Sequence, residues 1–305
     1  MKVSDYSEKE LVALLERGEL LLDLKPFVVR IRSDIASVAR DIALMYAQFD
    51  TCTVDSFADF HVAVLFDSGV LGRIRARARF FFDGRPSFIP LPANQAFAML
   101  EWGLNWCVAA HSHQYLVIHA AVIERGGRAA ILPGPPGAGK STLCAGLVNR
   151  GWRLLSDELA LLDMDTKLLY GMCRPVNLKN VSIDIIKRFA PDVVMTIPVD
   201  DTSKGTIALM RPPAGSVGMV EHPARPAWVI VPHYSPGAPP VLDNHRQAET
   251  FMLIAEQSFN YDIHGIRGFS AVGRLIDTCR CHRFTYGNLD DAMCTFDELH
   301  AGVME

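Results

Sequence analysis

The sequence predicts an α/β protein in two parts, an α+β domain over residues 1–112 and an α/β domain over residues 113–305. Half of the 305 residues are hydrophobic and 21% are charged, which is enough apolar material for one large or two ordinary domains. The first part alternates helical with strand patterns, whereas the second contains a strand, a glycine-rich loop and a helix in immediate succession. The boundary near residue 112 rests on composition.

The first part is expected to begin with an amphipathic helix. Ser7 and Glu10 have the spacing of a capping box, and leucines recur at helical intervals from Leu11 to Leu22. The same reasoning gives the elements that follow: a strand over 27–32, a helix from Ser33 or Asp34 to about Ala47, a strand over 60–66, and a mostly buried helix from Asn94 to about Ala110.

Arginines alternate with apolar residues between Arg73 and Phe80. A period of two with one charged face predicts a half-exposed strand. Charged strand faces most often meet solvent, but this face would also suit an acidic peptide or carrier. The arginines concerned are Arg73, Arg75, Arg77 and Arg79.

The second part is expected to open with a β-hairpin. Two apolar runs, 116–123 and 129–132, flank the turn at Arg125-Gly126-Gly127. Beyond residue 165 many prolines separate short strand patterns. Helical patterns return at 183–189, 248–257 and 269–278.

The hairpin leads directly into GPPGAGKS, which fits the pattern GxxxxGK[ST] in full. In such a loop the backbone N–H groups surround a polyphosphate, the lysine binds the outer phosphates, and the last hydroxyl ligates Mg²⁺. A helical pattern at 142–148 follows, so the positive end of a helix dipole also faces the anion. We therefore expect ATP or GTP to bind with Mg²⁺. The expected contacts are Gly134, Gly137, Ala138, Gly139, Lys140, Ser141 and Thr142.

Two adjacent acids, Asp157 and Glu158, come after one helical pattern and a short strand over 152–155. Adjacent carboxylates can divide the work of phosphoryl transfer: one orients Mg²⁺ together with Ser141, and the other accepts a proton from the attacking hydroxyl. Asp163 is the competing candidate, because it ends an apolar run in the form of a Walker B aspartate.

The stretch from His119 to Asp163 resembles the catalytic core of the HPr kinase/phosphorylase family. That family combines a histidine on the strand before the phosphate loop, the loop itself, and a paired acidic motif after RGxRLL. The matching residues are His119, the loop 134–141 and the segment 150–158. Four longer segments are similar to the A-type HPr-kinase-related kinases, over most of the chain: IHAAVIERGGRAAILPGPPGAGKSTL, RGWRLLSDELALLD, RPVNLKN and KGTIALMRPP.

The resemblance implies a P-loop domain of the HPr kinase/phosphoenolpyruvate carboxykinase type, with a mixed sheet and an ATP-dependent serine kinase activity. It associates Asp157 with the metal and Glu158 with proton transfer, although HPr kinases have aspartate at the second position. His119 and Lys140 complete the catalytic set that it implies.

Three cations in loops rich in proline or glycine, Lys179, Lys204 and Arg211, are candidates for neutralising the transferring phosphoryl group. Solvation of an ordinary loop explains each of them equally well. We include Lys204 and Arg211 among the expected nucleotide contacts.

The expected acceptor is a serine of a peptide or small protein. The N-terminal part is too large for a lid, and related kinases occur with peptide-modification systems and PqqD-like peptide-binding proteins. HPr itself is not expected, because the glycine-rich second signature of HPr kinases is missing from the sequence. Two alternatives stay open: a small-metabolite kinase on the same core, and a nucleotide-binding switch or scaffold with little transfer activity.

Charge and composition argue against other partners. The net charge is −4 without a block of like charge, so neither nucleic acid nor a membrane surface is expected to bind. Charged residues interrupt the longest apolar runs and the N-terminus lacks a signal-peptide pattern, which favours the cytoplasm. Seven scattered cysteines fit reduced thiols, and the CRCH and HSH segments lack the second pair of a zinc site. Oligomerisation is left open.

Overall fold

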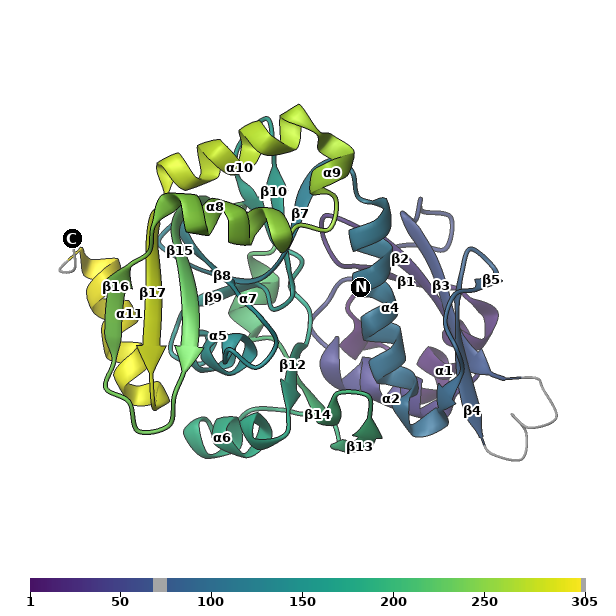
Figure 1. Ribbon diagram of the computed structural model, residues 1–305. Coiled ribbons are helices and arrows are strands. Elements are labelled where there is room, and N and C mark those ends of the chain that lie inside the picture. The colour runs from purple at the N-terminus through teal and green to yellow at the C-terminus, as the bar shows by residue number, and fades with distance from the viewer. Residues whose placement is uncertain (68–75, 303–305) are drawn as a thin grey trace.

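The computed structural model describes residues 1–67 and 76–302. Within these ranges the chain is a mixed α/β protein with three β-sheets. Figure 1 shows an N-terminal sheet and a larger C-terminal sheet on opposite sides of the long helix α4 (Ala96–His111). The division expected at residue 112 falls between α4 and the next strand, β7 (Tyr115–Arg125).

The first helix is shorter than its leucine pattern predicts. The capping box is confirmed: Ser7 accepts a hydrogen bond from the backbone of Glu10 at the start of α1 (Glu8–Arg17). The helix ends at Gly18, which adopts a left-handed conformation with φ 70°. The expectation of one apolar helical face reaching Leu22 was therefore wrong, because the segment after this cap is strand β1 (Leu20–Asp23).

The N-terminal sheet has six strands in the order β1-β2-β3-β4-β5, with β6 paired to β4. Helix α2 (Ala36–Met45) and α4 pack with this sheet in one continuous cluster of buried side chains. The strands expected at 27–32 and 60–66 are confirmed, as are both helices. The remaining strands are β2 (Val28–Ser33), β3 (Phe60–Phe66), β4 (Arg77–Phe82), β5 (Arg85–Pro86) and β6 (Leu91–Pro92).

The arginine-rich strand is an interior strand. Arg73 and Arg75 lie outside the described residues. Arg77 donates a hydrogen bond to the carbonyl of Pro90, and Arg79 forms an ion pair with Asp67 at 3.1 Å. Because β4 also has strands on both sides, these two arginines bind within the fold, and they give no support to an acidic docking surface.

The C-terminal sheet has eight strands in the order β11-β10-β7-β8-β15-β17-β16, with β9 paired to β7. It is mixed, since β15 runs parallel to β8 and to β17 whereas the other pairs are antiparallel. The strands are β8 (Arg128–Pro133), β9 (Arg153–Ser156), β10 (Leu159–Asp163), β11 (Leu169–Tyr170), β15 (Arg225–Tyr234), β16 (Val241–Asn244) and β17 (Arg280–Tyr286).

Successive residues of β7 face two different cores, because side chains alternate along a strand. Val117 and Ala121 join the cluster shared with the N-terminal sheet, whereas Ile118 and Ala120 join a second cluster. Figure 1 shows the helices of the two faces. One face carries α5 (Lys140–Val148) and α11 (Leu289–Ala301), and the other carries α8 (Gln247–Glu256), α9 (Tyr261–His264) and α10 (Ile266–Thr278).

A small antiparallel sheet in the order β12-β14-β13 lies beside α5, the helix that follows the glycine-rich loop. Helix α6 (Val181–Phe189) follows β12 and packs on α5. The helical patterns expected at 183–189, 248–257 and 269–278 are confirmed in α6, α8 and α10. The bounds still to be given are β12 (Val176–Lys179), β13 (Val199–Thr202), β14 (Gly205–Met210) and α7 (Ala214–Gly218).

None of the helices within residues 1–67 and 76–302 combines the length and the apolar character that crossing a bilayer requires.

We predict that Gly103→Ala destabilises the protein. A β-carbon at this position of α4 would overlap the ring of buried Phe80 on β4, and overpacking of this kind costs about 1–3 kcal/mol. The matched control is Gly273→Ala in α10, where a β-carbon meets nothing within 4 Å and helix propensity gains up to about 1 kcal/mol. Urea unfolding measures both. Equal stabilities for the two variants would show that α4 does not pack this closely on the sheet.

Candidate functional site

The register of β7 brings the glycine-rich loop and the acid pair together. Ala120 pairs with Pro133, the residue just before the loop. On the other edge of β7, Val122 pairs with Ser156 and His119 with Leu159. The chain thus leaves β9 opposite Val122 and enters β10 opposite His119, so the acid pair lies across β7 from the start of the loop, which follows the partner of Ala120.

The loop has the conformation that its glycines allow. Gly134, Gly137 and Gly139 have φ values of 144°, 85° and 93°, which side chains with a β-carbon rarely adopt. The hydroxyl of Tyr286 donates to the carbonyl of Gly139 at 3.0 Å, and a β-carbon on Gly139 would collide with this hydroxyl. Helix α5 begins at the next residue, Lys140.

The side chain of Lys140 folds back over its own loop. Its ammonium group donates to the carbonyl of Gly134 and, at 3.1 Å, to that of Pro135. Burial lowers the pKa of this ammonium group, while the nearby Asp157 carboxylate opposes the shift. The lysine is held where it can exchange loop carbonyls for phosphate oxygens.

Asp157 is the buried member of the acid pair, with 6% of its surface exposed. Its Oδ2 accepts a hydrogen bond from the backbone N–H of Asn177 at 3.0 Å. Its Oδ1 has no partner of ordinary hydrogen-bond geometry, although the Ser141 hydroxyl is near enough to lower the pKa of the carboxyl group. Burial, reinforced by the charge of Glu158, outweighs that effect and raises the pKa of Asp157 to about 7.

Glu158 is half-buried and held by two amides. The Asn105 side-chain N–H₂ donates to Oε2, and that of Asn177 donates to Oε1 at 3.4 Å. Asn105 belongs to α4 and Asn177 to β12, so the carboxylate is fixed from two separate elements.

A cavity of about 780 Å³ joins these groups. Its walls also include Lys179 and Arg188, and aromatic or apolar side chains from α6, β15, β17 and the start of α11. The expected site residues that line it are His119, Gly137, Gly139, Lys140, Ser141, Thr142, Asp157 and Glu158.

Four expected nucleotide contacts are not part of this lining. Gly134 and Ala138 belong to the same loop but do not border the cavity. Lys204 is exposed, and its ammonium group lies 4.8 Å from the centre of the Trp102 ring. Arg211 donates its backbone N–H to the carbonyl of Val194, and its side chain does not reach the cavity.

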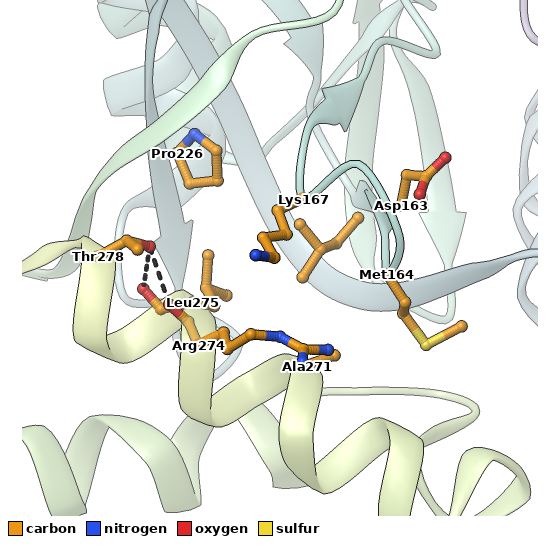
Figure 2. A pocket seen from close by; sticks show the side chains of 9 residues that line it. Asp163, Met164, Lys167, Pro226, Ala271, Arg274, Leu275 and Thr278 are labelled. Carbon is orange, nitrogen blue, oxygen red and sulfur yellow. Dashed lines mark hydrogen bonds between the residues drawn. The ribbon is translucent and has the colours of Figure 1, made fainter.

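Asp163, the competing acid, lies elsewhere. It lies four positions after Leu159 along β10, about 13 Å at the usual rise per residue. Its Oδ1 accepts the backbone N–H groups of Asp165 and Thr166 at 2.8 and 2.9 Å. Figure 2 shows it at the edge of a small separate pocket beside α10, with its carboxylate turned away from Lys167. Its role is to shape the turn after β10.

His119 is half-buried at the edge of the cavity. Its backbone N–H donates to the carbonyl of Gln257 at 2.7 Å, and its ring lies 5.8 Å from that of Phe259. Burial and the charge of Lys140 lower the pKa of the imidazole, so the ring is neutral near pH 7.

The residues around Asp157 fit a magnesium ion. A buried, unpartnered carboxylate oxygen lies beside the Ser141 hydroxyl, and Mg²⁺ is usually held by one or two carboxylates plus substrate phosphates and water. Among the described residues, no cluster of three or more His, Cys, Asp or Glu side chains is placed to hold a metal. The donor set therefore suits an ion that arrives with a nucleotide.

Sequence reasoning missed Asn105 as a functional residue. It lies in an apolar helix, more than fifty residues before the acid that it contacts, and no motif marks it. Asn177 was visible only as part of RPVNLKN.

The family models and the curated proteins contain no match to this chain.

We predict that Mg²⁺-dependent nucleotide binding strengthens as pH rises from about 6 to 8. With a pKa of about 7 in the ligand-free fold, Asp157 must lose a proton to face a cation, so binding releases that proton below pH 7. The stability of the ligand-free protein changes with pH in the opposite direction. The raised pKa of Asp157 contributes stability that is fully present below about pH 4 and is lost as pH rises through about 7.

Thermal shift with ATP, with and without Mg²⁺, measures the effect across this pH range. Asp157→Asn, which keeps the shape of the side chain, should flatten the pH dependence of the Mg²⁺-dependent part of the shift. An unchanged pH dependence in this variant would exclude Asp157 from the cation site.

Proposed function

We propose that the protein is an ATP-dependent kinase that transfers the γ-phosphoryl group to a hydroxyl, namely a serine of a peptide or small protein. The observation that carries the proposal is that the phosphate loop and the acid pair line one cavity. The proposal includes membership of the HPr-kinase-like group, with the phosphoenolpyruvate carboxykinase-like form of the P-loop domain. The mixed sheet is in keeping with that form.

The loop and its lysine account for binding the triphosphate. The first residues of α5 line the cavity, and the free backbone N–H groups of a helix N-terminus attract anions together with the helix dipole. Lys140 exchanges its loop carbonyls for phosphate oxygens, and Lys179 and Arg188 add positive charge at the cavity wall. Ser141 and Asp157 would hold Mg²⁺, which would neutralise charge on the outer phosphates when bound.

Glu158 is the proposed general base. Its carboxylate lines the same cavity and is oriented by two amides, so it can accept the proton of a hydroxyl positioned for attack on the γ-phosphorus. His119 is neutral near pH 7, and it pairs across β7 and β10 with Leu159, the residue after Glu158. We assign it a hydrogen bond to the acceptor or to the transferring group.

The presence of a second oriented carboxylate, Glu158, supports ATP-driven transfer over nucleotide binding alone. A nucleotide switch needs the loop and a cation site, but it does not need a second, separately oriented carboxylate. Among the described residues the Glu158 carboxylate forms no salt bridge and is held by two neutral amides, so it is not committed to an ion pair of the fold. Transfer explains that placement.

We predict that Lys140→Ala removes the thermal shift caused by MgATP without unfolding the protein. The lysine bonds only to carbonyls of its own loop in the described structure, so its loss affects the ligand more than the fold. Lys9→Ala, at an exposed position in α1, is the matched control. A full shift in Lys140→Ala would place the nucleotide elsewhere.

We predict that Glu158→Gln retains MgATP binding while transfer falls by about 10²- to 10⁴-fold, the usual range for loss of a general base. The amide keeps the size of the side chain but accepts no proton. Initial rates of phosphorylation of the unmodified acceptor measure the loss, with exposed Glu256→Gln as control. If Glu158→Gln transfers normally and Asp157→Asn does not, the two acids have the opposite roles.

Incubation with γ-labelled ATP and a cell extract identifies the acceptor class. Label in a peptide or protein supports the proposal. Label only in a small molecule favours a metabolite kinase on the same core. Nucleotide binding without any transfer would leave a switch or scaffold, and the kinase proposal would be abandoned.

A further inference from the structure

A buried ion pair lies behind the acid pair. Arg174 and Glu101 are only 8% and 4% exposed, and their side chains meet at 3.1 Å between Nη1 and Oε2. The other oxygen of Glu101 accepts the hydroxyl of Tyr46 at 2.5 Å. Glu101 comes from α4 and Tyr46 directly follows α2, so the guanidinium of Arg174 is anchored on the N-terminal part of the chain.

The guanidinium fixes the amide of Asn105. Glu101 and Asn105 are four residues apart on α4 and so share one face of the helix. A second nitrogen of Arg174, Nη2, donates to Asn105 Oδ1. Because a guanidinium only donates, the amide oxygen of Asn105 must face it, and the N–H₂ must face Glu158. The donor direction therefore runs from Arg174 through Asn105 to Glu158.

The same arginine borders a small cavity of about 20 Å³ between α4, β12 and the acid pair. Four residues of its lining carry buried polar atoms without a hydrogen-bond partner: Arg174 Nε, Trp102 Nε1, Asn177 Oδ1 and Asp157 Oδ1. Two of these atoms are donors and two are acceptors, and Asp157 Oδ1 is the acceptor that we assign to the cation. A cavity of this size holds one water molecule, and a buried water typically makes about three hydrogen bonds.

We propose that Arg174 is a positioning residue for Glu158. It orients Asn105 by a direct hydrogen bond, and it orients Asn177 by way of one water molecule in this cavity. The water accepts from Arg174 Nε and Trp102 Nε1 and donates to Asn177 Oδ1. This orientation turns the Asn177 N–H₂ toward Glu158, where it already donates. Both amides that hold the carboxylate are thus oriented by one guanidinium.

This inference rests on the proposed function for its kinetic consequence, because only a kinase needs Glu158 at a fixed angle to the acceptor hydroxyl. Small errors in such geometry are costly, since a shift of about 1 Å lowers rates by as much as 10²-fold. The N-terminal part then contributes to the active centre itself, beyond any role in acceptor recognition.

The kinetic test uses Asn105→Ala, which leaves the Arg174–Glu101 pair intact. We expect kcat to fall tenfold or more while the affinity for MgATP stays within about twofold. Asn244→Ala, at an exposed position on β16 outside both cavities, should leave both values unchanged.

Combining Asn105→Ala with Glu158→Gln should slow transfer no further than Glu158→Gln alone, because Asn105 acts only through that carboxylate. An unchanged kcat in Asn105→Ala, or additive losses in the double variant, would overturn the proposal.

Crystal structures provide a test that needs no activity. In the wild type we expect electron density for one water within hydrogen-bond distance of Arg174 Nε and Asn177 Oδ1. In Arg174→Lys the ammonium group can pair with Glu101 but cannot also serve Asn105 and the water, so Glu158 should change its orientation. An empty cavity in the wild type, or an unmoved Glu158 in the variant, would contradict the proposal. If the wild type phosphorylates nothing, the proposed function fails while these structures still decide the positioning role.

Discussion

Strand β7 pairs with three other strands within eleven residues, and these pairings determine where the chemistry of the protein lies. On one edge, β8 runs antiparallel and ends where the phosphate loop begins. On the other edge, β9 and β10 follow one another with only the acid pair between them. Since strand registers are fixed by which side chains must be buried, the two cores on either side of β7 also fix the distance between loop and acids.

The acid pair interrupts the pairing along that edge at a polar turn. The Ser156 hydroxyl accepts the backbone N–H groups of Glu158 and Leu159 at 3.4 and 3.0 Å, which stabilises the break. The two acids then differ in surroundings. Asp157 is buried with one unpartnered oxygen, whereas Glu158 is oriented by amides from α4 and β12. This difference in environment is what allows two adjacent carboxylates to have different roles.

The sequence predicted the local features of the fold better than the contacts between distant segments that build the site. The capping box at Ser7, the strand at 60–66 and the loop before α5 follow from patterns within a few residues, and the structure contains them. The leucine pattern failed at Leu22 because one left-handed glycine, Gly18, outweighs helical periodicity. Lys204 and Arg211 have the charge and the loop setting of nucleotide contacts, but neither lines the cavity, because cavity lining depends on tertiary placement. Asn105 and the Tyr46-Glu101-Arg174 chain were out of reach for the same reason, since their contacts join segments far apart in sequence.

The most direct measurement is a crystal structure with Mg²⁺ and a non-hydrolysable ATP analogue. The account predicts that the triphosphate lies along loop 134–141, that Ser141 and Asp157 hold the Mg²⁺ ion, and that Glu158 faces the γ-phosphoryl group. A nucleotide bound outside this loop, or a triphosphate in the loop with neither acid directed at the metal or the γ-phosphoryl group, would contradict it.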